Sequence, residues 1–467
     1  MLHIPNLITA DTVSNSTQRM LGRRLLHMSR NAKAPENSLR FIRESPVVHT
    51  KTWLEALQTR QKLLDALPPD QKRGVVFSHN DVKTREVSPR RTGDSFSAVV
   101  FPFKDDPWFL DGYVNSFGRL RMGQLFMDLD RLSGIIANKH CAPAEPVIVT
   151  ASVDRILLLK RIDDLQERNL VLWGYVSWTG RSSMEITIHA ASTSESFTEP
   201  PTLEECRTYD SWLVANFTFV ARDPVTQKAF PINNLTPITR QELSEFVIAE
   251  KYNQKKKGIA KKQALTISPP SEEESRTIHN LWIKGRDMTK EEGRKITMKD
   301  TTIHSTGIMQ PQYRNRHSYM IFGGYMMRQT FELAYACAAA FTHLQPRFVS
   351  LDTVTFKNPV PVGSVLHLKA FVAYTQPGTR SRENLDNEST VDLHKGTLVQ
   401  IRVQSTVRDL DKENDLDAGT FIYSFFVEGD SGYIMIPESY EEMVTYLDGR
   451  RLAKQIEEYL DEIVTAV

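Results

Sequence analysis

The chain has 467 residues, of which 40% are hydrophobic and 25% are charged, and its formal net charge is +1. This length and composition predict two or three globular domains with buried cores. A near-neutral charge gives no global field that attracts nucleic acid or an anionic membrane, so local cations must bind any anionic ligand. We expect no membrane span, because no apolar run approaches the roughly 20 residues that a membrane helix needs.

The three cysteines, Cys141, Cys206 and Cys337, are odd in number and far apart in the sequence. This spacing fits neither a disulfide framework nor a zinc site. We therefore expect a reducing compartment and no metal.

The first 35 residues differ from the rest, because five basic residues stand there against a single acid, Asp11: they are Arg19, Arg23, Arg24, Arg30 and Lys33. This composition is typical of a mitochondrial transit peptide, and "RRLLHMS" is similar to a mitochondrial processing site. We predict a transit peptide over 1–35 and a location in the mitochondrial matrix; a disordered basic tail is the alternative. The polar segment 36–89 is predicted to be a helical N-terminal extension.

Residues 115–141 begin with a polar loop and a glycine and continue with apolar residues at helical spacing. Four of these residues fall on one face of the predicted helix: Leu125, Leu129, Leu132 and Ile136. Several strands are expected to follow, from "VDRILLLKRI" at Val153 to the aromatic "WLVANFTFVARD". This order predicts a first domain over 90–223.

A lysine cluster, "KYNQKKKGIAKK" at 251–262, lies between this domain and the next. Such a cluster can bind nucleic acid or a membrane surface. It lacks interleaved aromatic residues, however, and "SPPSEEES" follows it with the opposite charge. We therefore predict a flexible charged linker over 224–297 and no nucleic-acid partner.

The same order of elements recurs after the linker. A polar loop leads into "IFGG", and four apolar residues then share one helical face: Met327, Phe331, Ala334 and Ala338. Strands are expected from "LDTVTFKNPV" at Leu351 to "TFIYSFFVEG". We predict a second domain over 298–430, and a C-terminal tail over 431–467 in which "RLAKQIEEYLDEIV" forms an amphipathic helix.

A long antiparallel sheet with one helix buries that helix most simply by wrapping around it. The repeated helix and sheet, "IFGG" and "FKNPVPVGSVL" together resemble the hotdog domains of acyl-CoA thioesterases. The duplication, the leader and "NSFGRLRMGQLFMDLDRLSG" are similar to the mitochondrial double-hotdog members of that family, and the resemblance covers about 90–430. It implies an α+β fold of two tandem hotdog domains, each a long central helix wrapped by an antiparallel sheet.

The resemblance also implies an activity: hydrolysis of fatty acyl-CoA to free fatty acid and coenzyme A. The coenzyme A thioester is then the substrate, and no cofactor is expected. Hotdog pairs often associate further. We therefore expect a homo-oligomer, a trimer of double hotdogs with six hotdogs in each particle.

Two glycines, Gly323 and Gly324, stand where the second helix begins. Glycine permits close approach of a ligand or another helix, and the first amides of a helix are free donors with partial positive charge. We expect these amides to stabilise the oxyanion that forms on a thioester carbonyl. The alternative is that both glycines only permit tight helix packing. In the first copy the corresponding pair is Met122 and Gly123, with one glycine only.

In thioesterases of this type an asparagine in the loop before the helix and an acid within the helix act across the interface of two hotdogs. Counting from the helix start places Asn115 and Asp130 at these positions in the first copy. The same counts in the second copy give Arg316 and Phe331, which depart from the pattern. A local register difference of one residue would let neighbouring residues substitute for them.

Those neighbours are Asn315 or His317 in the loop and Glu332 in the helix. Two composite sites are then conceivable, and we favour the first. The first composite site comprises Asp130, Asn315 or His317, Gly323 and Gly324. The second composite site comprises Asn115, Glu332, Met122 and Gly123. The alternative for each of these residues is a purely structural role, such as that of a solvated acid on a helix or of a hydrogen-bonding residue within a loop.

Coenzyme A carries phosphates, so cations are expected at the mouth of the site. Arg314, Arg316 and Lys357 are candidates, although such side chains are more often simply solvated. Two other functions stay open: a non-catalytic acyl-CoA binding protein, and another acyl-thioester enzyme such as a hydratase. His317 is the single residue that favours a hydratase, because related hydratases use a histidine and an acid.

Overall fold

The computed structural model describes residues 82–262, 269–288, 294–315, 320–352, 354–377, 396–408, 415–429 and 432–466. All of them belong to one compact unit, His49–Val467. The predicted transit peptide and residues 36–81 of the predicted extension lie outside the described residues. So do Arg316 and His317.

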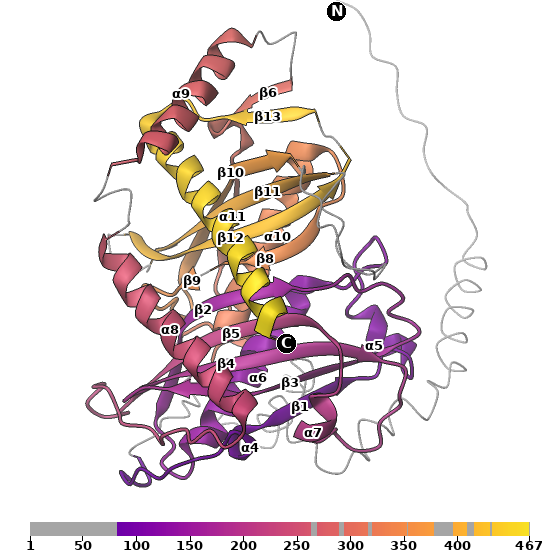
Figure 1. Ribbon diagram of the computed structural model, residues 1–467, viewed down its shortest axis with the longest axis vertical. Coiled ribbons are helices and arrows are strands. Elements are labelled where there is room, and N and C mark those ends of the chain that lie inside the picture. The colour runs from indigo at the N-terminus through magenta and orange to yellow at the C-terminus, as the bar shows by residue number, and fades with distance from the viewer. Residues whose placement is uncertain are drawn as a thin grey trace, which may run out of the picture. The chain divides into compact units, whose positions relative to one another are not determined.

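The first repeat places one long helix, α6, against five strands (Figure 1). Its elements in chain order are α4 (Thr92–Ser95), β1 (Ser97–Phe101), α5 (Pro107–Asp111), α6 (Met122–Cys141), β2 (Val147–Leu158), β3 (Asn169–Thr179), β4 (Ser183–Thr193), α7 (Leu203–Cys206) and β5 (Ser211–Arg222). The predicted apolar face of α6 is buried: Leu125, Leu129, Leu132 and Ile136 are at most 1% exposed. Burial stabilises the fold by about 1.5–3 kcal/mol for each such side chain, which anchors α6 to its sheet.

The second repeat has the same order around helix α10. Its elements are β6 (Arg294–Thr297), η1 (Lys299–Thr301), β7 (Ile303–Ile308), η2 (Pro311–Tyr313), α10 (Gly323–Thr342), β8 (Arg347–Leu351), β9 (Val354–Thr355), β10 (Val365–Pro377), β11 (Gly396–Arg408), β12 (Asp415–Glu428) and β13 (Tyr433–Ile436). The face predicted to be apolar, with Met327, Phe331, Ala334 and Ala338, is again buried. Strands β13 and β6 form a separate small parallel sheet.

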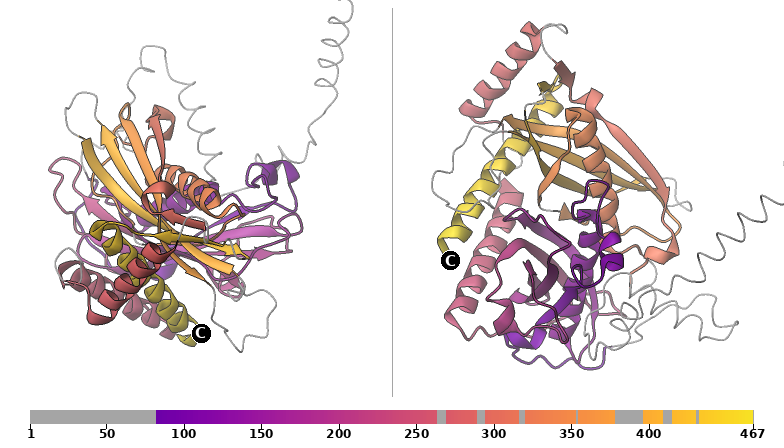
Figure 2. Two further views of the ribbon diagram at one scale, coloured as in Figure 1. Left: turned by 90° about the horizontal axis from the view of Figure 1, so that it is seen from above. Right: turned by 90° about the vertical axis from the view of Figure 1, so that its right-hand side faces the viewer.

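The strands of both repeats form one continuous antiparallel sheet, in the order β1-β3-β4-β5-β2-β8-β12-β11-β10-β7, with β9 paired to β2 (Figure 2). The repeats meet where β2 pairs with β8, at Ile156↔Leu351 and Leu157↔Ser350. Outward from this junction, both halves have the same sequence of connections. The structure therefore has the predicted α+β architecture of two tandem hotdog domains. We keep 90–223 and 298–430 as their proposed boundaries.

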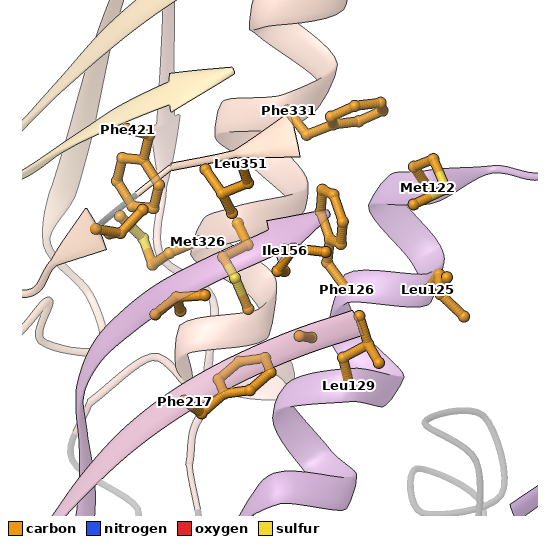
Figure 3. Close-up of a cluster of buried hydrophobic side chains, with 14 of the residues drawn as sticks. Met122, Leu125, Phe126, Leu129, Ile156, Phe217, Met326, Phe331, Leu351 and Phe421 are labelled. Atoms are coloured by element: carbon orange, nitrogen blue, oxygen red, sulfur yellow. The ribbon is translucent and has the colours of Figure 1, made fainter. Parts of the chain in front are cut away.

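The two central helices pack against each other through a shared apolar cluster (Figure 3). Phe126 of α6 and Phe331 of α10 meet edge to face, with ring centroids 5.3 Å apart. Ile156 and Leu351, which pair across the sheet junction, are fully buried in the same cluster. One core thus spans both repeats and fixes the start of each helix beside the other.

The segment 224–297, which we predicted to be a flexible linker, contains two helices, α8 (Arg240–Lys262) and α9 (Glu272–Asp287). Helix α8 packs on β3, and its Glu245 accepts a 2.9 Å hydrogen bond from the Tyr175 hydroxyl. Helix α9 begins with a capping box in which Ser271 and Glu274 each bond the other's backbone amide. The lysine cluster therefore ends a helix that is bound to the first sheet, and the expectation of a flexible linker does not fit this part of the segment.

Helix α11 (Tyr440–Ala466) packs on β10 of the second repeat (Figure 1). Its Arg451 pairs with Glu274 of α9 at 2.5 Å. Strands β3 and β10, which stand one strand in from the two edges of the sheet, therefore each carry the helix that follows their repeat. In the described part of the chain, no helix is long and apolar enough to cross a membrane.

Candidate active site

The loops that precede α6 and α10 have the same backbone pairing but different lengths. The Asn115 amide donates to the Arg119 carbonyl at 2.8 Å, and the Asn315 amide donates to the Met320 carbonyl at 2.7 Å. The paired residues are thus four positions apart in the first loop and five in the second. Asn315, and not Arg316, is therefore the structural counterpart of Asn115.

Asp130 joins the two repeats directly. Its side chain extends from α6 to the start of α10, where its Oδ2 accepts a 2.7 Å hydrogen bond from the Gly324 amide. Its Oδ1 accepts a 3.2 Å hydrogen bond from the hydroxyl of Thr150 on β2. Burial raises the pKa of Asp130 to about 6, although both hydrogen bonds favour the charged form. The result is a desolvated carboxylate with a pKa well above that of a solvated aspartate.

The helix start beside Asp130 has no room for a side chain at Gly324. A Cβ there would lie 2.6 Å from Cε2 of Phe322 and 2.9 Å from the Met127 Cα. A Cβ on Gly323 would lie 3.3 Å from Oδ1 of Asp130. Tight helix packing, our alternative explanation, therefore does apply to Gly324. The Gly324 amide is also not the free donor that we expected, because it already binds the carboxylate.

The two loop asparagines differ in what their side-chain oxygens do. Asn115 Oδ1 accepts hydrogen bonds from the Phe117 and Arg119 amides, at 2.9 Å and 3.0 Å, and so closes its own loop. Asn315 Oδ1 is buried and has no hydrogen-bond partner among the described residues. A buried oxygen without a partner is costly unless a ligand or water satisfies it. Among the described residues, the loop asparagine oxygen that stays open to a ligand or water is therefore that of Asn315.

The second composite site lacks a buried acid. Helices α6 and α10 begin at Met122 and Gly323, so Phe331 stands at the helical position that corresponds to Asp130. Its neighbour Glu332 has a side chain that is 45% exposed and pairs with Arg121 at 2.9 Å. Glu332 does lie near the start of α6, since a Cβ on Gly123 would be 3.4 Å from its Oε1. It is a solvated, ion-paired acid.

A cavity of about 420 Å³ lies at the second composite site. The cavity therefore lies at the alternative of our two composite sites, and not at the one that we favoured. The polar residues of the cavity wall include Asn115, Arg119, Arg121, Arg161, Glu332 and Arg347. Residues 316–319, which belong to the loop of the first composite site, lie outside the described residues.

The predicted coenzyme A cations have different surroundings. Lys357 is exposed and pairs with Asp417 at 2.6 Å. The Nε atom of Arg314 is buried without a partner among the described residues. Sequence reasoning missed Thr150, because no local motif marks it and only the register of β2 brings it to Asp130. The cavity arginines were missed for the same reason, since they come from separate loops and strands.

No family model matches this sequence. The chain is 34% identical over 358 residues to acyl-coenzyme A thioesterase 2, chloroplastic, of Humulus lupulus, which covers 74% of this chain and 76% of that protein. It is 30% identical over 415 residues to acyl-coenzyme A thioesterase 9, mitochondrial, of Mus musculus, which covers 86% of this chain and 84% of that protein. An acyl-CoA hydrolase from Staphylococcus aureus, solved with butyryl coenzyme A, is 22% identical, with 38% of this chain and 94% of that chain covered and a TM-score of 0.30.

Proposed function

This chain belongs to the acyl-CoA thioesterase family, and we propose that it hydrolyses fatty acyl-CoA at the first composite site. The observation that carries this assignment is the 2.7 Å contact between Asp130 of the first repeat and the Gly324 amide of the second. That contact places a buried carboxylate at the start of a long helix, where partial positive charge is concentrated. In the second composite site, the acid next to the corresponding helical position is Glu332, which is exposed and ion-paired.

The reaction adds the oxygen of a water molecule to the thioester carbonyl carbon and breaks the carbon–sulfur bond. We propose that Asp130 accepts the proton of this water, or attacks the carbonyl itself and is released by water afterwards. In either case the leaving thiolate of coenzyme A takes up a proton. A carboxylate with a pKa near 6 is ionised at neutral pH yet more basic than a solvated aspartate, which favours both roles.

Negative charge that develops on the carbonyl oxygen needs a donor other than the Gly324 amide, which holds Asp130. We propose that the Gly323 amide, one position earlier in the helix, supplies it with the help of the helix dipole. Asn315, whose buried side-chain oxygen has no partner among the described residues, would orient the attacking water. Arg314 and Lys357 remain our candidates for the phosphates of coenzyme A, and Lys357 would have to exchange its ion pair with Asp417.

The test is a thiol-release assay with acyl-CoAs of increasing length, on protein that lacks residues 1–35. We expect the wild type to release coenzyme A and the Asp130→Asn variant to lose this activity. Binding without thiol release at any length would make the protein an acyl-CoA binder. Consumption of an unsaturated acyl-CoA without thiol release would support the hydratase alternative, for which His317 lies outside the described residues.

We also propose a mitochondrial matrix location, on the basic leader and on the mitochondrial name of the Mus musculus relative. A fluorescent reporter fused to residues 1–40 should enter mitochondria, and replacing Arg23 and Arg24 by Glu should impair import. A reporter that stays in the cytosol would contradict the proposal.

For assembly we propose a trimer of double hotdogs. Light scattering should then give about three times the mass of the 53.3 kDa chain. A particle with the mass of one chain at micromolar concentration would contradict this proposal and leave the enzymatic one intact.

A further inference from the structure

The lining of the cavity at the second composite site combines two chemically different groups of residues. The polar group includes the guanidinium groups of Arg119, Arg121, Arg161 and Arg347. The apolar and aromatic group includes Phe331, Tyr335, Phe348 and Phe426. The cavity volume of about 420 Å³ falls within the range of roughly 300–1,000 Å³ typical of small-molecule sites.

The charged residues at the cavity are not all balanced. Arg161 and Arg347 both pair with Glu428, which lies 3.2 Å from the Nε atom of Arg347, and the Nη1 atom of Arg347 also lies 3.9 Å from Asp163. Burial, together with repulsion from Arg119 and Arg161, lowers the pKa of Arg347. The Nη1 atom of Arg119 is buried and has no hydrogen-bond partner among the described residues. An incompletely paired guanidinium of this kind is stabilised by an anion that enters the cavity.

Phe331 belongs to the apolar part of the lining and stands at the helical position that corresponds to Asp130. Its neighbour Glu332 also lines the cavity, but its carboxylate is already paired with Arg121 at 2.9 Å. The ring of Phe331 meets that of Phe348 edge to face, with centroids 5.8 Å apart. Figure 3 shows Phe331 projecting from α10 toward the side of Met122 at the start of α6. An alkyl chain would find only hydrophobic contacts on this wall.

From this arrangement we propose that the cavity binds an amphiphile with an anionic head and an alkyl chain, and holds it without hydrolysis. The head pairs with Arg119, and the chain lies against Phe331 and Phe348. This chemistry has two sources in the reaction, the fatty carboxylate that is released and the acyl-CoA that is consumed. That the ligand is held without hydrolysis rests on the proposed function, which assigns catalysis to the first composite site.

The test is calorimetric titration of the full chain with decanoate and, separately, with S-decyl-coenzyme A, a thioether that cannot be hydrolysed. We expect Arg119→Ala to weaken binding of the ligand at this cavity about 10-fold or more, the size of a lost charge-assisted pair. The matched control is Arg240→Ala on helix α8, which removes the same charge from an exposed position and should leave the affinity unchanged. Arg119→Gln serves if Arg119→Ala does not fold, as judged by thermal unfolding.

An Arg119-dependent signal with decanoate assigns the site to the product, and one with S-decyl-coenzyme A alone assigns it to the substrate. Equal affinities in the Arg119 and Arg240 variants, or no saturable binding of either ligand, would overturn the proposal. The assignment of catalysis is read separately, from thiol release by Asp130→Asn protein. Loss of that activity together with equal affinities in the two arginine variants would leave the thioesterase proposal standing alone.

Discussion

The two composite sites are made from the same parts and differ chiefly in one helical position. Asp130 is buried and binds the start of the opposite helix, whereas the corresponding Phe331 belongs to an aromatic cluster and its neighbour Glu332 is solvated. A pair of hotdogs creates two interface sites by symmetry, but a single chain can change each copy independently. The comparison teaches that duplication lets one site keep a buried acid while the other replaces it with an aromatic residue.

Removing each acid is the strongest way to break this comparison. Asp130→Asn keeps the size of the side chain and removes the carboxylate, so kcat should fall by at least about 100-fold with little change in acyl-CoA binding. Glu332→Gln is the matched variant and should leave kcat close to that of the wild type. Thiol release measures both. A larger loss of kcat in Glu332→Gln than in Asp130→Asn would assign catalysis to the second composite site instead.

The helix starts provide a second matched pair. Gly324→Ala forces a Cβ to within 2.9 Å of the Met127 Cα, so the helices must separate and the contact with Asp130 must lengthen. We expect a loss of kcat of about 10- to 100-fold and a destabilisation of about 1–3 kcal/mol. In Gly123→Ala the nearest atoms lie at 3.3 Å and belong to side chains, so activity and stability should change little. Equal effects in thiol release and thermal unfolding would mean that the two helix starts are equivalent.

The loop asparagines should separate activity from stability. Asn315→Ala removes an oxygen that no described residue uses, so we expect kcat to fall about 10-fold while the melting temperature is nearly unchanged. Asn115→Ala removes two hydrogen bonds that close its loop and should cost about 1 kcal/mol of stability with little loss of kcat. A larger kcat effect at Asn115 would contradict the assignment.

The pH dependence should give the smallest effect. Burial raises the pKa of Asp130 to about 6, so the folded protein holds the active, ionised form above that pH and loses it below. We expect kcat/KM to be half its plateau value near pH 6 in the wild type and in Glu332→Gln. The folded pKa lies above the ordinary aspartate value of 3.8, so ionisation destabilises the fold and Asp130→Asn should raise the melting temperature at pH 8 but not at pH 3. A pH-independent rate between pH 5 and 8 would exclude Asp130 as the titrating group.

Helical periodicity predicted the central helices well, because burial on one face requires the same spacing wherever the helix lies. Leu125 and Met327 were both predicted on buried faces for this reason, and both are fully buried. Asp130 and Asn115 were predicted from the resemblance to the family. The choice of Asn315 in the second copy stayed open, because that loop differs in length and counting back from the helix start gives Arg316 instead. Thr150 lies on a strand that local sequence does not connect to Asp130, so only the folded sheet brings the two together.

The helices within 224–297 show a different failure of sequence reasoning. High charge concealed α8, whose stability comes from contacts with β3 and from polar bonds such as that of Glu245 to Tyr175. Helix α9 did carry a readable signal, the Ser271 and Glu274 capping box within "SPPSEEES", and we interpreted those acids only as charge. We considered only the net charge of this segment and therefore missed a helix start that the spacing of Ser271 and Glu274 specifies.

The shared sheet makes the site independent of protein concentration. Each hotdog contributes one strand to the junction, β2 or β8, and the contact between Asp130 and Gly324 joins residues of both hotdogs. If the hotdogs were separate chains, dilution would dissociate them, and the Asp130 carboxylate would lose its hydrogen bond to the start of α10. Here the covalent connection keeps the partner at an effective concentration of order millimolar, so the enzyme can work at an abundance far below the dissociation constant that separate halves would need.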